Sequence, residues 1–314
     1  MDLSVIIVSF NTSDRLRQCL RSVFNSTAKS AFEVFVVDNA SADGSAEMVA
    51  AEFPKVRLIK NPENLGYSKA NNVALRKILS PLPTPPHQGQ GNSKENSSPR
   101  SGGGEVGGGK IPRYVLLLNP DVEISRDSFD KMISFMDNDK SIGIAGCKVM
   151  KSDGTLDKAS RRSFPNFQNS LRYFLGLRSS YNLDLPDDEI AEVDSVMGAF
   201  LMIRSEAVDK IGLLDEAFFM YGEDLDWCYR AKQAGYKVMY APMTTVIHHK
   251  GSSSRKLPGK ALYEFHRAMF VFYDKHYSAQ HNAVVNYLVK VGIWARYCLK
   301  VMQNFLRTDK YVSK

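Results

Sequence analysis

The stretch Leu116-Leu117-Leu118-Asn119-Pro120-Asp121-Val122-Glu123 decides the fold of this chain. An apolar run that stops abruptly at a turn is typical of a buried strand in a parallel sheet. Ligands of open α/β sheets bind beyond the carboxyl ends of such strands. We therefore expect Asp121 at the ligand-binding edge of the sheet, where its carboxylate would suit Mg²⁺ or Mn²⁺. The alternative is an ordinary turn, because Asn, Pro and Asp follow many strands that bind nothing.

Before this stretch, apolar runs alternate with segments of helical spacing. The expected strands cover residues 3–9, 32–37, 56–59 and 114–118, and the expected helices cover residues 14–24, the segment ending at 53, and 68–79. Ser41 or Asp43 is expected to cap the second helix. The alternation predicts βαβ units with right-handed crossovers, and hence a mostly parallel sheet flanked by helices.

After Asp121 the pattern changes. We expect helices at 128–136, from Ser205 onward and at 223–234, and strands at 142–150, 193–203, 237–240 and 245–248. Gly235 is a natural C-cap for the helix at 223–234. Gly198 interrupts the strand at 193–203, and residues 157–188 show no regular pattern.

The composition is that of a globular protein, with 44% hydrophobic and 24% charged residues among 314. The four cysteines form no CxxC pair, which argues against a zinc ribbon and fits a reducing compartment. We find no signal peptide and no run of about 18 apolar residues, so we expect a cytoplasmic protein. Residues 80–110 hold eight Gly and five Pro. We expect 80–112 to be a disordered insertion, with a regulatory or partner-binding loop as the alternative.

The net charge of +7 is concentrated at the C-terminal end. Residues 250–314 contain twelve Lys/Arg and three Asp/Glu, so the first 249 residues have a net charge of about −2. Residues 283–307 fit one helix with most polar side chains on one arc and apolar ones such as Phe305 opposite, although Ile293 and Tyr297 intrude on the polar arc. This pattern favours a helix lying on a membrane surface. The alternative is a helix packed on the body or on a partner subunit.

Three acids stand within four positions in the sequence Tyr221–Trp227 (YGEDLDW). They open a predicted helix, where the helix dipole stabilises negative charge. Acidic residues are common at helix N-termini for this reason alone, so the three acids need not have a catalytic role. The aromatic run at 218–221 just before them makes a solvated position less plausible. Acids behind such a run suggest carboxylates in a cleft, one of which could act as a general base.

Two further positions could carry chemistry. His248 and His249 follow a predicted strand and precede the sequence KGSSS, and a histidine there could ligate a metal, although paired histidines are more often packing features. Asp38 ends the second strand and could accept a hydrogen bond from a base or ribose, or merely start a turn. The motifs GxGxxG, GxxxxGK[ST] and GxSxG are absent, which weakens dinucleotide, P-loop and esterase interpretations.

Taken together, the motifs of this chain resemble those of family 2 glycosyltransferases, close to the rhamnosyltransferase-like branch. The matching segments follow the family order and are VIIVSFN (5–11), VVDNASADGS (36–45), NPENLGYSKANN (61–72), LLLNPDV (116–122), GAFLMIR (198–204), FFMYGEDLDWCYR (218–230) and VIHHKGSSS (246–254). They cover residues 3–255 apart from the insertion. They are specific for fold and reaction type and much less so for the sugar.

The resemblance implies a GT-A fold at 1–255, Rossmann-like and mostly parallel, with a helical C-terminal extension at 256–314. It implies an inverting, metal-dependent hexosyltransferase that uses Mg²⁺ or Mn²⁺. The donor would be a dTDP- or UDP-sugar, with dTDP-rhamnose among the candidates. The acceptor would be a hydroxyl of a glycan or lipid-linked acceptor in cell-surface polysaccharide synthesis, at the inner face of the cell membrane.

The resemblance also assigns residues. The catalytic set would be Asp224 as general base, with Glu223 and Asp226 orienting it or the acceptor. The metal would be held by Asp121 and by His248, which has the family's HxxG spacing, with His249 as the fallback. Asn119 replaces the first acid of the family's Asp-x-Asp motif, so metal binding would rest on Asp121. The nucleotide would be bound by Val8, Ser9, Asn11, Asp38, Asn39, Gly66, Asn71, Asn72 and Asn119.

Three alternatives remain. A processive polysaccharide synthase would need several membrane spans and a QxxRW-like motif, and both are missing from the sequence. A catalytically inactive nucleotide-sugar or glycan-binding protein of the same fold stays open because of Asn119. A nucleic-acid binder using the basic tail is disfavoured by the acidic residues, so we expect no nucleic-acid partner.

Overall fold

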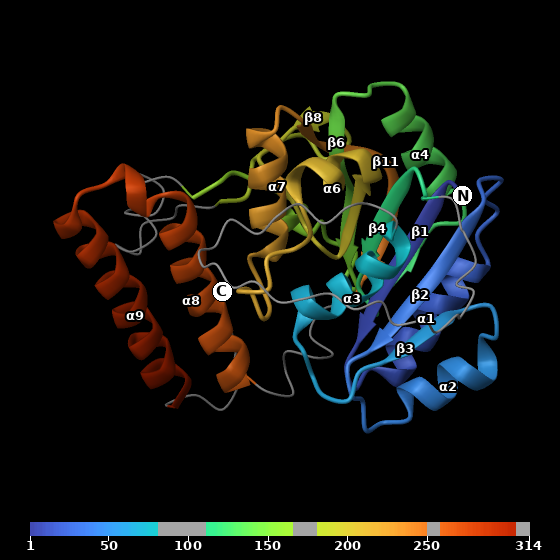
Figure 1. The fold of residues 1–314 in the computed structure, drawn as a ribbon, viewed down its shortest axis with the longest axis horizontal. Coiled ribbons are helices and arrows are strands. Elements are labelled where there is room, and N and C mark those ends of the chain that lie inside the picture. The colour runs from blue at the N-terminus through green and yellow to red at the C-terminus, as the bar shows by residue number, and fades with distance from the viewer. Residues whose placement is uncertain (81–110, 166–180, 250–257, 306–314) are drawn as a thin grey trace, which may run out of the picture.

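The computed structural model describes residues 1–80, 111–165, 181–249 and 258–305 (Figure 1). The expected disorder at 80–112 concerns mainly residues 81–110, which lie outside the described residues. The expected domain boundary at 255 also falls outside them and stays a prediction.

The centre of the molecule is a nine-stranded sheet of order β3-β2-β1-β4-β10-β6-β11-β5, with β8 also paired to β11. Its strands are β1 (Leu3–Ser9), β2 (Phe32–Asp38), β3 (Arg57–Lys60), β4 (Tyr114–Leu118), β5 (Val122–Ile124), β6 (Ile142–Lys151), β8 (Ala191–Glu192), β10 (Phe200–Arg204) and β11 (Lys237–His248). From β3 to β4 all pairs are parallel. β10 lies antiparallel between β4 and β6, and β11 pairs parallel with β6. The sheet is therefore mixed, and the parallel part is the one that the alternating pattern predicted.

Helices cover both faces of this sheet, and further helices follow at the C-terminal end (Figure 1). They are α1 (Ser13–Phe24), α2 (Ser45–Glu52), α3 (Tyr67–Leu79), α4 (Ser128–Asp137), α6 (Ser205–Ile211), α7 (Glu223–Gln233), α8 (Pro258–His276) and α9 (Ala283–Phe305). The predicted cap of α2 was wrong. Gly44, with φ +79°, is the N-cap residue, and Asp43 instead accepts the N–H of Ser45 at 3.1 Å.

The central strands are buried on both faces, which explains their continuous apolar runs. In β4, Leu116 and Leu118 pack into the core under α1 and α4. Val115 and Leu117 point the other way, into the core under α3 and α7. These two cores fix the end of β4, and therefore the position of the turn that follows it.

Three predicted strands differ in the structure. The segments at 237–240 and 245–248 form the single strand β11, with irregular register between Tyr240 and Thr245. The segment at 193–203 is split into β9 (Ser195–Val196) and β10, separated by Met197-Gly198-Ala199. The stretch without regular pattern contains β7 (Arg161–Arg162), which pairs antiparallel with β9.

The C-terminal extension is helical, as predicted, but α8 precedes the expected helix, which corresponds to α9. Figure 1 shows α8 beside α7 and α9 on the outer side of α8, away from the sheet. Among the helices that the structure describes, none is long and apolar enough to cross a membrane. The α/β fold with a helical extension is thus confirmed, whereas the sheet has more antiparallel pairing than the sequence indicated.

Candidate active site

The turn after β4 is held on both sides. The N–H of Asn119 donates to the carbonyl of Ala199 at 3.0 Å, and the N–H of Val122 donates to the carbonyl of Asn119 at 3.2 Å. The thiol of Cys19 on α1 also donates to the carbonyl of Asn119, with Sγ 3.6 Å from the oxygen. These contacts give the backbone around Asp121 one defined position.

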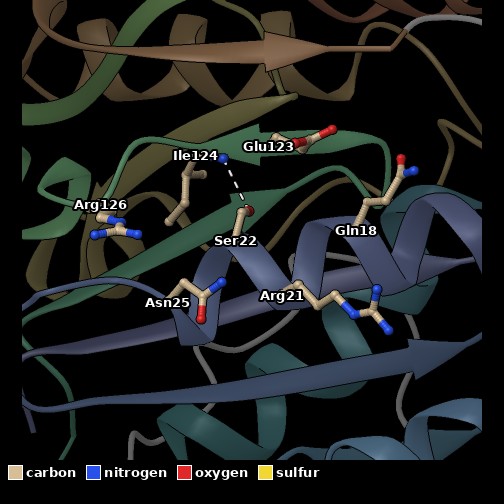
Figure 2. A pocket seen from close by; sticks show the side chains of 7 residues that line it. All are labelled: Gln18, Arg21, Ser22, Asn25, Glu123, Ile124 and Arg126. Atoms are coloured by element: carbon tan, nitrogen blue, oxygen red, sulfur yellow. Dashed lines mark hydrogen bonds between the residues drawn. The ribbon is translucent and has the colours of Figure 1, made fainter.

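A shallow surface pocket lies between α1 and the segment after this turn (Figure 2). It is lined by Gln18, Arg21, Ser22, Asn25, Glu123, Ile124 and Arg126. The hydroxyl of Ser22 accepts the N–H of Ile124 at 3.1 Å, which fastens β5 to α1. None of the predicted site residues lines this pocket, so it is separate from the candidate site.

Asp121 and His248 lie side by side. β5 pairs antiparallel with β11 so that Val122 faces His248, and this register brings His248 Nε2 to 3.2 Å from Asp121 Oδ1. His248 Nδ1 lies 4.0 Å from Asp157 Oδ2. Both ring nitrogens of His249 are engaged elsewhere, at 2.6 Å from Glu123 Oε1 and 2.9 Å from Ser152 Oγ. His248, not His249, is therefore the histidine beside Asp121.

These residues fit a weakly coordinated divalent ion. Within the described part of the chain, no group of three or more His, Cys, Asp or Glu is arranged to hold a metal ion. Mg²⁺ commonly uses one or two protein carboxylates and completes its shell with water and substrate phosphates. Asp121 and His248 are both mostly buried, and among the described residues His248 Nδ1 has no hydrogen-bond partner. A carboxylate next to an imidazole suits Mn²⁺ at least as well as Mg²⁺.

The three acids that open α7 point to different partners. Asp224 Oδ2 accepts hydrogen bonds from Arg162 Nη2 at 2.8 Å and from the N–H of Gly198 at 2.9 Å. Arg162 Nη2 also donates to the carbonyl of Val196. Asp224 is only 8% exposed, so these contacts orient its carboxylate at the margin of the core.

The segment Met197-Gly198-Ala199 connects the two halves of the site. Ala199 holds Asn119 by its carbonyl, and Gly198 holds Asp224 by its N–H. The carbonyl of Gly198 accepts the hydroxyl of Tyr67 at 3.2 Å. The turn before Asp121 and the carboxylate of Asp224 are therefore fixed relative to each other by adjacent residues.

Tyr67 lies among the acids of the site. Burial raises the pKa of its hydroxyl, and the negative charges of Asp224 and Asp121 raise it further. Tyr67 therefore stays protonated and keeps donating to Gly198. Acidic residues from two separate elements, α7 and the turn after β4, therefore lie close enough to influence the pKa of Tyr67.

Glu223 has an unusual environment. Its side chain is buried, and Oε2 has no hydrogen-bond partner among the described residues. Burial raises the pKa of Glu223 to about 8, with the charge of Asp224 as the next cause. Its carboxyl is consequently protonated at neutral pH and can donate a hydrogen bond.

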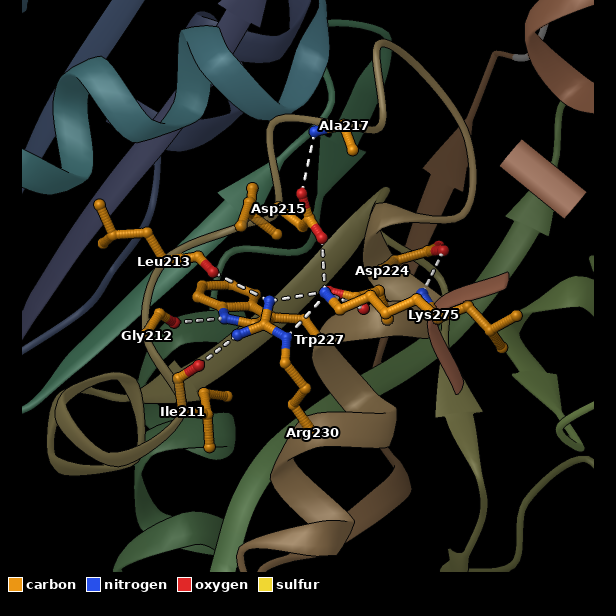
Figure 3. A network of polar contacts seen from close by, with 12 residues as sticks. Ile211, Gly212, Leu213, Asp215, Ala217, Asp224, Trp227, Arg230 and Lys275 are labelled. Atoms are coloured by element: carbon orange, nitrogen blue, oxygen red, sulfur yellow. Dashed lines mark hydrogen bonds and ion pairs between the residues drawn. The ribbon is translucent and has the colours of Figure 1, made fainter. Parts of the chain in front are cut away.

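Asp226 is fully buried in an ionic network between α7 and α8. Figure 3 shows its partners Arg230 and Lys275 beside Trp227. Asp226 contacts Arg230 Nη2 at 2.9 Å, Lys275 Nζ at 2.8 Å and His276 Nε2 at 2.7 Å. Around it, Trp227 Nε1 donates to the carbonyl of Gly212 at 2.9 Å. The contacts of Asp226 thus join α7 to α8, whereas the resemblance suggested that it orients Asp224 or the acceptor.

The predicted nucleotide residues begin at the carboxyl ends of β1 and β2. Asn11, at φ 54°, donates its N–H to Ser41 Oγ, and its Oδ1 accepts the N–H of Ala42. Asp38 is 4% exposed; Oδ2 accepts the N–H of Ser41, and Oδ1 has no partner among the described residues. Val8 and Ser9 are buried beside them. A buried acceptor without a donor is what a ligand N–H would complete.

The remaining nucleotide candidates divide into two kinds. Asn39 binds Asn61, Asn64, Leu65 and Gly66, and Asn72 binds Leu214 and Glu216, so both side chains are fully used in fixing loops. Asn71 is different, because its buried Oδ1 has no partner among the described residues. At Gly66, with φ +80°, an added Cβ would lie 2.5 Å from the carbonyl oxygen of Phe219.

Sequence reasoning missed two residues of the site. Arg162 lay in the stretch without regular pattern, and its partner Asp224 is 62 positions away. Tyr67 lay within the family segment at 61–72 but was not singled out, and its contact Gly198 is 131 positions away. The only local signal for Arg162 was the presence of an arginine in a segment without a regular pattern.

Comparison with known proteins agrees with this architecture. The profile described as "Glycosyltransferase like family 2" matches residues 2–262. The N-acetylglucosaminyl-diphospho-decaprenol L-rhamnosyltransferase of Mycobacterium tuberculosis is 24% identical over 98% of this chain and 95% of its own length. The dTDP-rhamnosyl transferase of Shigella flexneri is 25% identical over 72% of this chain and 62% of its own length.

The fold is also similar to solved structures. The mannosyltransferase of Pyrobaculum calidifontis, in complex with GDP-Man and Mn²⁺, matches with a TM-score of 0.54 and 16% identity, covering 96% of this chain and 71% of that protein. This similarity supports the GT-A fold. The profile match extends over most of the chain, from β1 into α8. The chain therefore belongs to glycosyltransferase family 2.

Proposed function

We propose that this protein transfers a sugar, with inversion, from a dTDP- or UDP-sugar to a hydroxyl of a glycan or lipid-linked acceptor in cell-surface polysaccharide synthesis. The two similar proteins named for rhamnosyl transfer make dTDP-rhamnose the first donor to test. One of these names specifies a diphospho-decaprenol acceptor. A lipid-linked acceptor would put the reaction at the inner face of the cell membrane.

The observation that carries this proposal is the segment Met197–Ala199. It fixes Asn119 through Ala199 and Asp224 through Gly198. Displacement at a sugar carbon needs the leaving diphosphate on one side and a proton acceptor on the other. Two acidic positions, held on separate elements by one short segment, suit that requirement.

Asp224 is the proposed general base. It would take the proton of the acceptor hydroxyl while that oxygen attacks the anomeric carbon and the nucleoside diphosphate leaves from the opposite face. Its oxygens already accept N–H groups from Arg162, Gly198 and Leu225. A carboxylate offers about four acceptor sites, so one remains for the hydroxyl.

Glu223 and Asp226 would assist in different ways. Protonated Glu223, whose pKa burial raises, would donate a hydrogen bond to the acceptor. Asp226 would position α7 through its contacts with Arg230 on α7 and with Lys275 and His276 on α8. Glu223 and Asp226 would therefore both assist Asp224, Glu223 by binding the acceptor and Asp226 by positioning the helix.

The donor would be bound at the carboxyl ends of β1 and β2. Asp38 Oδ1 would accept an N–H of the base, and Asn71 Oδ1 would accept a hydroxyl of the ribose. Val8, Ser9 and Asn11 would line the nucleotide pocket, and Asn119 would face the diphosphate. Gly66, Asn39 and Asn72 would shape the pocket wall rather than touch the nucleotide, in keeping with their contacts.

Asp121 and His248 would hold Mg²⁺ or Mn²⁺. When bound, the ion would stabilise the negative charge that develops on the leaving diphosphate. The pairing of a carboxylate and an imidazole at 3.2 Å supports this assignment.

A second candidate is an inactive nucleotide-sugar or glycan-binding protein. Asn119 in place of an acid and the engagement of Asp224 by Arg162 favour it. The deciding experiment incubates the protein with Mn²⁺, dTDP-rhamnose or a UDP-sugar, and a lipid-linked acceptor, and measures release of the nucleoside diphosphate. Release that depends on the acceptor and is abolished in Asp224→Asn supports transfer. Donor-induced thermal stabilisation without release, at any pH, would favour the inactive binder.

A further inference from the structure

Tyr67 lies between the donor side and the base side of the candidate site. It is the first residue of α3, and its ring is partly buried against the core under α3 and α7. The hydroxyl donates to the carbonyl of Gly198 at 3.2 Å. Side chains packed in a core stay in one rotamer, so the packed ring also fixes the position of its hydroxyl.

Gly198 is held at both of its backbone polar groups. Its carbonyl accepts the Tyr67 hydroxyl, and its N–H donates to Asp224 Oδ2 at 2.9 Å. Gly198 is buried, so both groups need partners within the protein. A glycine has no Cβ to restrict its backbone. The direction of the Gly198 N–H therefore depends on what holds its carbonyl.

The backbone next to Tyr67 is tied to the donor side. The carbonyl of Gly66 accepts Nδ2 of Asn39 at 3.1 Å, and Asn39 directly follows Asp38 at the end of β2. The N–H of Tyr67 donates to the carbonyl of Phe219 at 2.6 Å. Tyr67 is therefore fixed by the loop beside the proposed donor pocket, and its hydroxyl reaches across to the base side.

A direct role of this hydroxyl in the chemistry is disfavoured. A hydroxyl has one proton to donate, and Tyr67 uses it for Gly198. Burial raises the pKa of Tyr67, so the side chain does not act as a base near neutral pH. Its contact with Gly198 points to an indirect role, exerted through the residue that holds Asp224.

We propose that Tyr67 is a positioning residue, whose hydroxyl holds Gly198 and thereby keeps the carboxylate of Asp224 aligned with the donor. This deepens the proposed function, since it rests on Asp224 as the general base. A misplacement of about 1 Å can cost about 100-fold in rate. Loss of the hydroxyl should therefore slow the chemical step and leave donor binding unchanged.

Tyr67→Phe tests this role, because it removes the hydroxyl and keeps the ring. We expect kcat to fall about tenfold and the KM for the donor to stay within about twofold. The matched control is Tyr240→Phe, which removes a hydroxyl that donates to the carbonyl of Asp187 at 2.7 Å. Both of its kinetic constants should stay unchanged. Equal losses of kcat in the two variants, or an unchanged kcat in Tyr67→Phe, would overturn the proposal.

A double-mutant cycle with Arg162 separates positioning of the base from a general loss of structure. Arg162 and the N–H of Gly198 hold the same oxygen of Asp224. Two substitutions that misdirect one carboxylate should not have additive effects. We expect Arg162→Ala combined with Tyr67→Phe to have a kcat within about threefold of that of Arg162→Ala alone. Full additivity would contradict the shared role.

Amide hydrogen exchange tests the same link without donor, acceptor or metal. Exchange of the Gly198 N–H, followed by NMR of ¹⁵N-glycine-labelled protein, should be at least about tenfold faster in Tyr67→Phe than in the unmodified protein or in Tyr240→Phe. Unchanged exchange would refute the link. Faster exchange in a protein that transfers no sugar from any donor would support the link and refute the proposed function instead.

Discussion

Arg162 Nη2 lies 2.8 Å from Asp224 Oδ2, joining the short strand β7 to the first turn of α7. The same nitrogen donates to the carbonyl of Val196 and to Ser195 Oγ. Burial would lower the pKa of Arg162, but the neighbouring charge of Asp224 raises it. The guanidinium therefore stays charged and holds the carboxylate in one orientation.

Replacing Arg162 should lower turnover more than it weakens donor binding. We expect Arg162→Ala to reduce kcat about 100-fold, because a misdirected base loses most of its contribution of about 10² to 10⁴. Arg162→Lys should recover part of the rate. Steady-state kinetics with varied donor and acceptor would measure this. An unchanged kcat in Arg162→Ala would show that the pair does not position Asp224.

Asp121→Ala should weaken the Mn²⁺-dependent binding of a nucleoside diphosphate. Removing one of two protein ligands should cost about tenfold or more in affinity. Titration calorimetry with dTDP or UDP, with and without Mn²⁺, would check it, and His248→Ala should behave alike. His249→Ala is the control, since its ring contacts Glu123 and Ser152. If His249→Ala has the larger effect, the histidine assignment is wrong.

Asp226→Asn should destabilise the protein by about 3–5 kcal/mol, since it removes the fully buried charge that pairs with Arg230 and Lys275. Although burial opposes it, the hydrogen bond from His276 and the charges of Arg230 and Lys275 lower the pKa of Asp226 to about 2. Because this folded-state pKa is below the unfolded value, its stabilisation is present above about pH 3.8 and is lost as the pH falls towards 2.

Urea unfolding monitored by circular dichroism would measure both effects. Asp274→Asn is the matched control, because it removes a half-exposed pair with Lys290 between α8 and α9 and should cost less than about 1 kcal/mol. Equal losses in the two variants would contradict the importance of the buried network.

Glu223→Gln should change how stability depends on pH. The folded-state pKa of about 8 is above the unfolded value, so the folded protein keeps a proton that the unfolded chain releases from about pH 4.5 upward. Stability should therefore decline between about pH 4.5 and 8, by at most about 1.4 kcal/mol per pH unit from this group. The variant should lose that slope. Urea unfolding at several pH values would measure the free energy of unfolding of both proteins. If the two free energies change in parallel with pH, the prediction is wrong.

The sequence by itself determined the elements and their order. The apolar run at 116–118 needed to be buried on both faces, and this requirement made β4 a central strand. The seven segments in family order identified the fold and pointed to Asp121, Asp224 and His248. Such information is local, because strand and helix periodicity and turn residues act over a few positions.

The tertiary structure alone decided which of these residues meet. The register of β5 on β11 selected His248 over His249. Arg162 reached Asp224 across 62 positions, and Asp226 found its partners on α8, 49 and 50 positions on. The reason is physical: a buried charge must be paired, and only the packing of distant elements determines which partner is within reach.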